Sequence, residues 1–255
     1  AELVYATDVV YFWVEEGLRY DEGDLRRLVD QFTTDTYPTN REFFGSEWTP
    51  GVDGDPHVLM LLARGLGDNV AGYYSPVDEY SRLAHEYSNE TEMFYLNADN
   101  VSPSDSDLPG TLAHEFQHMI HWYQDRNEES WMNEGFSEVA ALINGFDPGN
   151  FDALYAENPD QQLNSWPGGP GESTAHYGES FLFLAYFLDR FGNDLTRALV
   201  SRPEDGLASM DATLAEQRVT DPRRGRVITA DDVFADWAAA LWLDDPTVPD
   251  GRYGY

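Results

Sequence analysis

The sequence predicts an α+β fold, with a strand-rich N-terminal lobe followed by a helical C-terminal lobe. Before about residue 110, short apolar runs alternate with Gly, Pro, Asn and Asp, as strands and their turns do. After residue 110, apolar residues recur with the 3.6-residue period of helices. The chain has 255 residues, of which 42% are hydrophobic, enough for a substantial core. We place the lobes at 1–125 and 126–255, joined through a helix over 111–124, with a cleft where they meet.

The strands and the one helix of the first lobe follow from local patterns. Apolar runs bounded by turn residues predict strands at Val9–Val14, His57–Ala63 and Glu92–Leu96. A helix is predicted after the acidic start at 21–24, where Leu25, Leu28, Val29 and Phe32 follow the helical period. We expect this helix to end before Tyr37-Pro38, because the residue before a proline disfavours helical angles.

The second lobe is predicted to consist of helices after the joining helix. Apolar stripes or cap signals predict them at Thr111–Gln124, Trp131–Ile143, Thr174–Phe191, Asp194–Ser201 and Ala230–Leu243. Gly192 is placed at the end of one helix, because glycine favours the left-handed angles found there.

Charge and composition exclude several classes of partner. The chain has 47 acidic and 15 basic residues, a formal net charge of −32, and every basic residue is arginine. Nucleic acids and anionic membrane surfaces would be repelled, and no apolar run reaches the roughly 20 residues of a membrane helix. We expect no nucleic-acid partner, no membrane partner and a monomer. The absence of cysteine leaves histidine and carboxylate as the ligands for any metal.

The acidic residues allow two interpretations. The first is a heavily hydrated surface suited to a salty or acidic medium. The second is Ca²⁺ binding, for which Asp53, Asp55 and the stretch Asp99–Asp107 are the densest candidates, although neither matches an EF-hand loop. The first residues lack the basic and apolar regions of a signal peptide, so we expect the sequence to be a mature or excised segment.

An H-E-x-x-H motif, His114-Glu115-Phe116-Gln117-His118, lies within a predicted helix. Residues four apart lie on one face of a helix, so the two imidazoles can converge on one ion at about 2.0–2.1 Å. Glu115 then lies beside the metal without binding it. A random sequence of this length and composition would contain the motif roughly 0.01 times on average. The motif therefore predicts a zinc site.

A catalytic zinc needs a third protein ligand and one open position. The next predicted helix begins near Trp131 and can bring Glu134 over the histidine pair. Glu138, one turn further on, is placed to accept the free ring N–H of a ligating histidine. The alternative for both glutamates is a solvated helix face, which the preceding motif disfavours.

Together, His114-Glu115-Phe116-Gln117-His118 and Asn133-Glu134-Gly135-Phe136-Ser137-Glu138 resemble the gluzincin zinc metallopeptidases, the thermolysin-like clan. Within that clan, the local sequence around both motifs is most similar to secreted bacterial peptidases of the hyicolysin and immune inhibitor A type. The motifs cover about 111–143, with weaker similarity around 176–192. Two departures are a shorter spacing from His118 to Glu134 than in thermolysin and Glu138 in place of an aspartate.

The resemblance implies a zincin-like fold with the active-site helix between the lobes, and a secreted zinc endopeptidase acting on protein or peptide. It further implies one catalytic Zn²⁺, held by His114, His118 and Glu134, with Glu115 as general base. The metzincin pattern fails, because His121 and Gln124 stand where it needs Gly and His. His121 is expected to be a packing or hydrogen-bonding residue. No exopeptidase signature of the gluzincin aminopeptidases is present, which favours internal cleavage.

Two non-enzymatic hypotheses for the function stay open. One is a catalytically inactive, peptidase-like binding module of a larger secreted or surface protein, and the other is a metal-stabilised structural domain. A structural site would need a fourth ligand, whereas the motifs supply three.

Two further parts of a peptidase site are predicted. The oxyanion donor is expected at the start of the helix at 174–191, as His176 or Tyr177, with Tyr177 preferred because a phenol remains a donor to about pH 10. The substrate is expected to add as a strand to a sheet edge, at Ala71–Ser75 or Glu92–Leu96. The first is preferred because its glycine permits close backbone approach.

Overall fold

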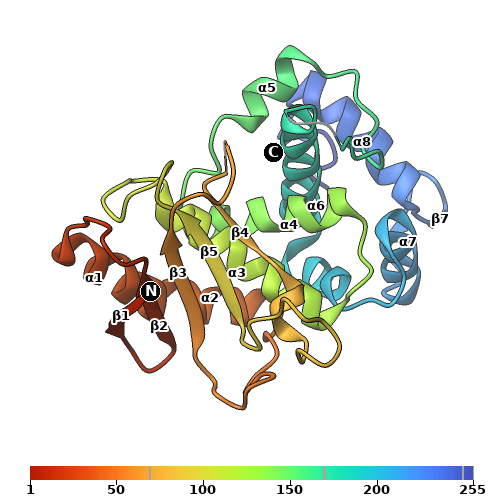
Figure 1. Cartoon of the computed structure of the whole chain (residues 1–255). Helices are drawn as coiled ribbons and strands as arrows, with labels where there is room; N and C mark the ends of the chain where they lie inside the picture. The colour runs from red at the N-terminus through yellow and green to blue at the C-terminus, as the bar shows by residue number, and fades with distance from the viewer. Residues whose placement is uncertain (69, 169–170, 249, 255) are drawn as a thin grey trace. The chain divides into compact units, whose positions relative to one another are not determined.

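The computed structural model describes residues 1–68, 70–168, 171–248 and 250–254. It divides into two compact units, Ala1–Tyr123 with Ala140–Pro148, and Gln124–Val139 with Gly149–Tyr255. The main sheet belongs to the first unit, whereas the second consists mostly of helices (Figure 1). The predicted α+β class is therefore confirmed, and the arrangement is consistent with a zincin-like fold.

The sheet of the first unit has five strands in the order β1-β2-β3-β5-β4. Their bounds are β1 Glu2–Ala6, β2 Val10–Val14, β3 Val58–Ala63, β4 Gly72–Tyr74 and β5 Met93–Asn97. Strands β2, β3 and β5 are parallel, and β1 and β4 pair antiparallel at the edges. The three predicted strands are confirmed within a residue at each end. Strand β1 is not predicted from the sequence, and its residues are half-buried or exposed.

Helix α1 (Glu22–Gln31) begins at Asp21, whose carboxylate accepts a hydrogen bond from the Asp24 N–H at 2.9 Å. Helix α1 ends at Gln31, before Tyr37-Pro38 as predicted, but the proline does not stop the helical path of the chain. A π-helical turn, Phe32–Thr36, leads directly into α2 (Tyr37–Phe44). Pro38 lies in the first turn of α2, and the Tyr37 N–H bonds to the Phe32 carbonyl in the wider i→i−5 pattern. The widened turn accommodates the proline where a regular helix would be broken.

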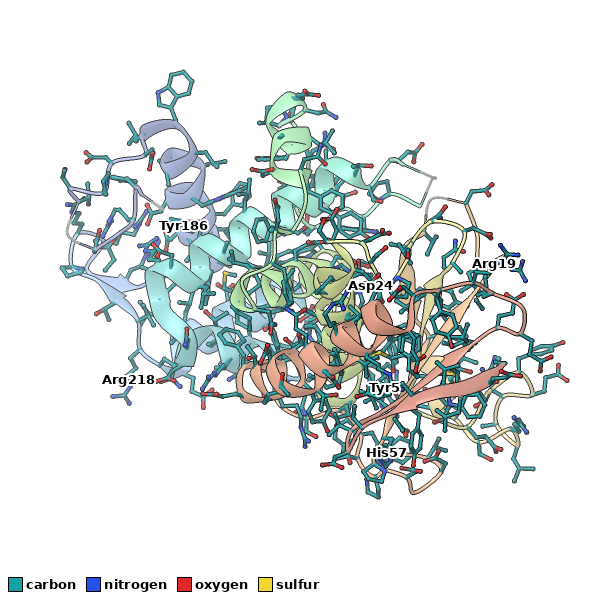
Figure 2. All side chains as sticks on the ribbon, turned by 90° about the vertical axis from the view of Figure 1, so that its left-hand side faces the viewer. Tyr5, Arg19, Asp24, His57, Tyr186 and Arg218 are labelled. Carbon is teal, nitrogen blue, oxygen red and sulfur yellow. The ribbon has the colours of Figure 1, made fainter. Side chains whose placement is uncertain are left out.

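Strand β1 packs beside α1 through a polar contact. The Tyr5 hydroxyl, labelled in Figure 2, donates to Asp30 at 2.7 Å, and the Arg26 guanidinium lies 5.0 Å from the Tyr5 ring.

Helix α3 (Leu108–Gln124) carries the H-E-x-x-H motif and is held by an aromatic cluster in the first unit. The Phe116 ring lies 5.4 Å from Phe32 and 5.1 Å from Tyr37, and Phe32 also contacts Phe94 of β5. Phe116 is fully buried. Because Phe116 lies between the two motif histidines in sequence, this packing fixes the rotation of α3 about its axis.

Helix α4 (Ser130–Ile143) is continuous, although its first ten residues belong to the second unit and its last four to the first. The second unit also contains α5 (Phe151–Glu157), α6 (Thr174–Val200), α7 (Gly206–Glu216), α8 (Ala230–Leu243) and the short hairpin of β6 (Thr220–Asp221) and β7 (Arg226–Val227). Helices α5 and α7 are not predicted from the sequence.

Two predictions in the second unit are confirmed. The bounds of α8 match, and its start carries a capping box between Thr229 and Asp232. Gly192 interrupts α6 with φ of 78°, at the predicted boundary between two helices.

The core of the second unit combines aromatic packing with buried ion pairs. Trp237 of α8 contacts Phe183 of α6 at 5.3 Å between ring centroids. The hydroxyl of Tyr186, labelled in Figure 2, donates to the Arg252 carbonyl at 2.8 Å. The Arg252 guanidinium pairs with buried Asp221 at 3.0 Å. None of the helices in the described ranges has the length and apolar character needed to cross a membrane.

Candidate metal centre

The motif histidines lie on adjacent turns of α3. Their Nε2 atoms are 3.0 Å apart, and their ring centroids are separated by 4.7 Å with the rings nearly perpendicular. Both histidines are half-buried, whereas Glu115 between them is 6% exposed. The predicted convergence of the two imidazoles is therefore confirmed, because the spacing of four residues brings one nitrogen of each ring close to the other.

Glu134 of α4 completes a group that could hold a metal ion. His114, His118 and Glu134 each offer one ligand atom, and these atoms all lie within 4.8 Å of one another. Two imidazoles and one carboxylate are a donor set typical of catalytic zinc. Among the residues that the structure describes, this is the one such group of three or more His, Asp or Glu side chains.

The part of α4 around Glu134 is anchored in the second unit. Trp131 is fully buried against Phe183 of α6, and its indole N–H donates to Glu129 at 2.6 Å. A Cβ on Gly135 would lie 2.8 Å from Leu184 Cδ1 and 3.0 Å from the Ser180 carbonyl oxygen. The missing side chain thus allows α4 to pack closely on α6 next to Glu134. Glu138, one turn further along α4, is 5% exposed.

His121, one turn after His118 on α3, is a packing residue, as expected. It is fully buried, and its Nδ1 lies 3.3 Å from the Gln117 amide nitrogen. Burial lowers the pKa of His121 to about 3, so its ring is neutral at physiological pH.

His176 and Tyr177 lie in the first turn of α6, where the prediction placed them. The Tyr177 ring stacks on Phe151 at 5.1 Å and meets the edge of Trp166 at 5.0 Å. His176 is buried, and its Nδ1 lies 3.9 Å from a Glu179 carboxylate oxygen. Burial lowers the pKa of His176 and raises the pKa of Glu179 to about 7. The role of either residue as oxyanion donor stays a prediction.

The acidic stretches considered for calcium make local hydrogen bonds. Asp53 accepts from the Asp55 N–H at 2.8 Å, and Asp55 pairs with the His57 ring. Asp99 accepts from the Gly65 N–H, and Asp105 from the Ser102 N–H, both at 2.8 Å. Calcium binding there stays a prediction.

Two asparagines beside α3 and α4 are not predicted from the sequence. The Asn40 amide donates to the Ala113 carbonyl at 2.8 Å, directly before His114, and Asn144 donates to Asn40 at 2.7 Å. Asn144 directly follows the predicted end of a helix at Ile143. No local signal distinguishes Asn40, because its partners are distant in sequence.

Comparison with known proteins gives one relative that bears on the site. The chain is 24% identical over 208 residues to the neutral metalloprotease ShpI of Staphylococcus hyicus. This similarity supports a place among the metallopeptidases. The match covers 73% of this chain and 46% of the relative, so the chain spans about half the length of that protein. No family model matches the chain.

Proposed function

We propose that the protein is a zinc-dependent endopeptidase of the gluzincin type, similar to the secreted hyicolysin and immune inhibitor A peptidases. The observation that carries the proposal is the donor set of His114, His118 and Glu134, with Glu115 between the histidines on the same helix. The similarity to a neutral metalloprotease supports the same class. A merely structural zinc would use four protein ligands.

In this mechanism His114, His118 and Glu134 hold the zinc. When bound, the ion lowers the pKa of its water and polarises the scissile carbonyl. Glu115 takes the proton of the attacking water and passes it to the leaving amine. Glu138 accepts the free ring N–H of a ligating histidine and so orients that ring. Tyr177, or His176 as the alternative, donates to the oxygen on which negative charge develops.

We place the peptide substrate along β4. The structure shows that β4 is an edge strand and that β5 is internal, so β4 can accept a further strand and β5 cannot. Gly72 of β4 has a different role from the expected one. A Cβ there would lie 2.8 Å from the Tyr95 carbonyl oxygen of β5, so the glycine permits close approach within the sheet.

The remaining parts of the proposal rest on composition and on the motif resemblance. They are a secreted monomer with lobes at 1–125 and 126–255, and a protein or peptide substrate. The net charge of −32 disfavours nucleic acids and anionic membranes as partners.

A combined metal and activity measurement tests the proposal. Purified protein is analysed for zinc and incubated with casein, with and without a chelator of divalent metals. We expect about one zinc per chain, and hydrolysis that the chelator abolishes and added Zn²⁺ restores. Bound zinc without hydrolysis would instead indicate the binding module, and absence of zinc would overturn the proposal.

A further inference from the structure

We propose that Asn40 and Asn144, the asparagine pair, are positioning residues that set the register between the two helices carrying the zinc ligands. The inference rests on the proposed zinc site. It assigns to two amides outside the motifs the task of holding α3 and α4 so that their ligands reach one ion.

The pair is connected by hydrogen bonds at each step. Asn40 of α2 has no exposed surface, and its Nδ2 donates to the Ala113 carbonyl oxygen at 2.8 Å. Its Oδ1 accepts from the Asn144 Nδ2 at 2.7 Å. A second donation from the same Asn144 nitrogen reaches the Ala140 carbonyl at 2.8 Å. The chain of bonds therefore runs from the backbone of α3 to the backbone of α4.

On the α3 side, the bond is made at the residue directly before the first ligand. In the i→i−4 pattern of α3, the Ala113 carbonyl also accepts from the Gln117 N–H and so closes the turn of helix that contains His114. A carbonyl oxygen has two lone pairs, so it can accept from Asn40 without losing its helical bond. Asn40 thus holds the backbone of the ligand-bearing turn itself.

On the α4 side, Asn144 belongs to a well-defined helix end. The Gly145 N–H bonds to the Leu142 carbonyl at 2.9 Å, the Phe146 N–H bonds to the Ala141 carbonyl at 3.0 Å, and Gly145 has φ of 76°. This is the Schellman pattern, which stops the helix at a defined residue. Because α4 is continuous, fixing its end also fixes Glu134, about 15 Å back along the helix at 1.5 Å per residue.

The helices touch where the pair acts. A Cβ on Gly110 of α3 would lie 3.4 Å from the Phe146 Cβ and 4.0 Å from the Ala141 Cβ. Such apolar contact is non-directional, so it holds the helices together without fixing their position along each other. Hydrogen bonds are directional, and the asparagine pair supplies them one turn from this contact. Metal–ligand distances are set to within about 0.2 Å, so a small slip of one helix would weaken zinc binding.

The test measures zinc affinity in the full chain by competition with a chromophoric chelator. The variants are Asn40→Ala, Asn144→Ala and the double variant. Asn97→Ala is a matched control, because Asn97 is also fully buried in the first unit and its amide donates to the Gly67 carbonyl at 2.8 Å. Unfolding by denaturant is measured for each variant, so that a general loss of stability is separated from a loss of zinc binding.

We expect each single variant of the pair to raise the zinc dissociation constant about tenfold, the lower end of the range for residues that orient ligands. The double variant should raise it no more than the more severe single variant, because the two amides act as one connection. Asn97→Ala should lose comparable stability while its zinc dissociation constant stays within twofold of wild type. Visible spectra of the Co²⁺-substituted proteins should change for the pair variants and not for Asn97→Ala.

Three results would overturn the inference. The first is equal zinc affinity in Asn40→Ala and Asn97→Ala, and the second is a wild-type dissociation constant in Asn144→Ala. If Asn40→Ala does not fold, the zinc dissociation constant of Asn144→Ala tests the inference by itself. This variant is expected to fold, since Asn144 is only half-buried at a helix end. The third is a wild-type protein that binds no zinc, which would overturn the proposed function and, with it, this inference.

Discussion

The Nε2 atoms of His114 and His118 lie 3.0 Å apart on α3. Two ring nitrogens this close share either a proton or a cation, and a zinc ion between them would use both lone pairs. Zinc that binds the folded state alone stabilises it, by about 2.7 kcal/mol at a free concentration 100 times the dissociation constant. We expect this increase in the free energy of unfolding for the wild type and none for His118→Ala. His85→Ala, which lies outside the metal group, should keep it. A zinc-dependent increase in His118→Ala would contradict the ligand assignment.

Replacing Glu115 by glutamine is expected to separate zinc binding from turnover. Glutamine has nearly the same shape and keeps a polar group beside the metal, but it cannot accept the proton of the attacking water. The kcat for casein or a model peptide should fall by 10²–10⁴-fold, while metal analysis finds the same zinc content as in the wild type. Proteolysis near the wild-type rate would rule out Glu115 as general base.

The oxyanion donor can be identified by comparing Tyr177→Phe with His176→Ala. Phenylalanine keeps the ring contacts of Tyr177 with Phe151 and Trp166 and removes only the hydroxyl. Loss of the true donor should lower kcat by about 10²–10³-fold, with little change in KM or zinc content. We expect this result for Tyr177→Phe. Full kcat in both variants would place the donor elsewhere.

A buried carboxyl in the first unit should make stability depend on pH. Glu92 is 2% exposed, and burial raises its pKa to about 7, compared with about 4.3 in the unfolded chain. Between these values the folded state binds more protons than the unfolded state, so the free energy of unfolding falls as pH rises through this window. The destabilisation from ionising Glu92 is absent below about pH 4.3 and complete above about pH 7, where it reaches at most about 4 kcal/mol.

Glu92→Gln isolates this effect, because the glutamine carbonyl can still accept the Val52 N–H that Glu92 accepts at 2.9 Å. The stability of the variant relative to wild type should therefore increase between pH 4.5 and pH 8, as measured by urea unfolding at several pH values. A difference independent of pH would contradict the assignment.

The amino-acid sequence by itself determined the features that depend on neighbours along the chain. The helix of the H-E-x-x-H motif, the strand at 58–63, the bounds of α8 and the break at Gly192 all follow from periodicity, caps and backbone preferences within a few residues. The pairing of His114 with His118 belongs to this class, because residues four apart in a helix must lie on one face.

Only the tertiary structure decided the features that join distant segments. Strand β1 has little apolar pattern and forms by pairing with β2. Pro38 continues a helix because a π turn precedes it. The hydrogen bonds of Asn40 to Ala113 and Asn144 cross 73 and 104 residues. Their partners are brought together by packing of the whole unit, which no local pattern records.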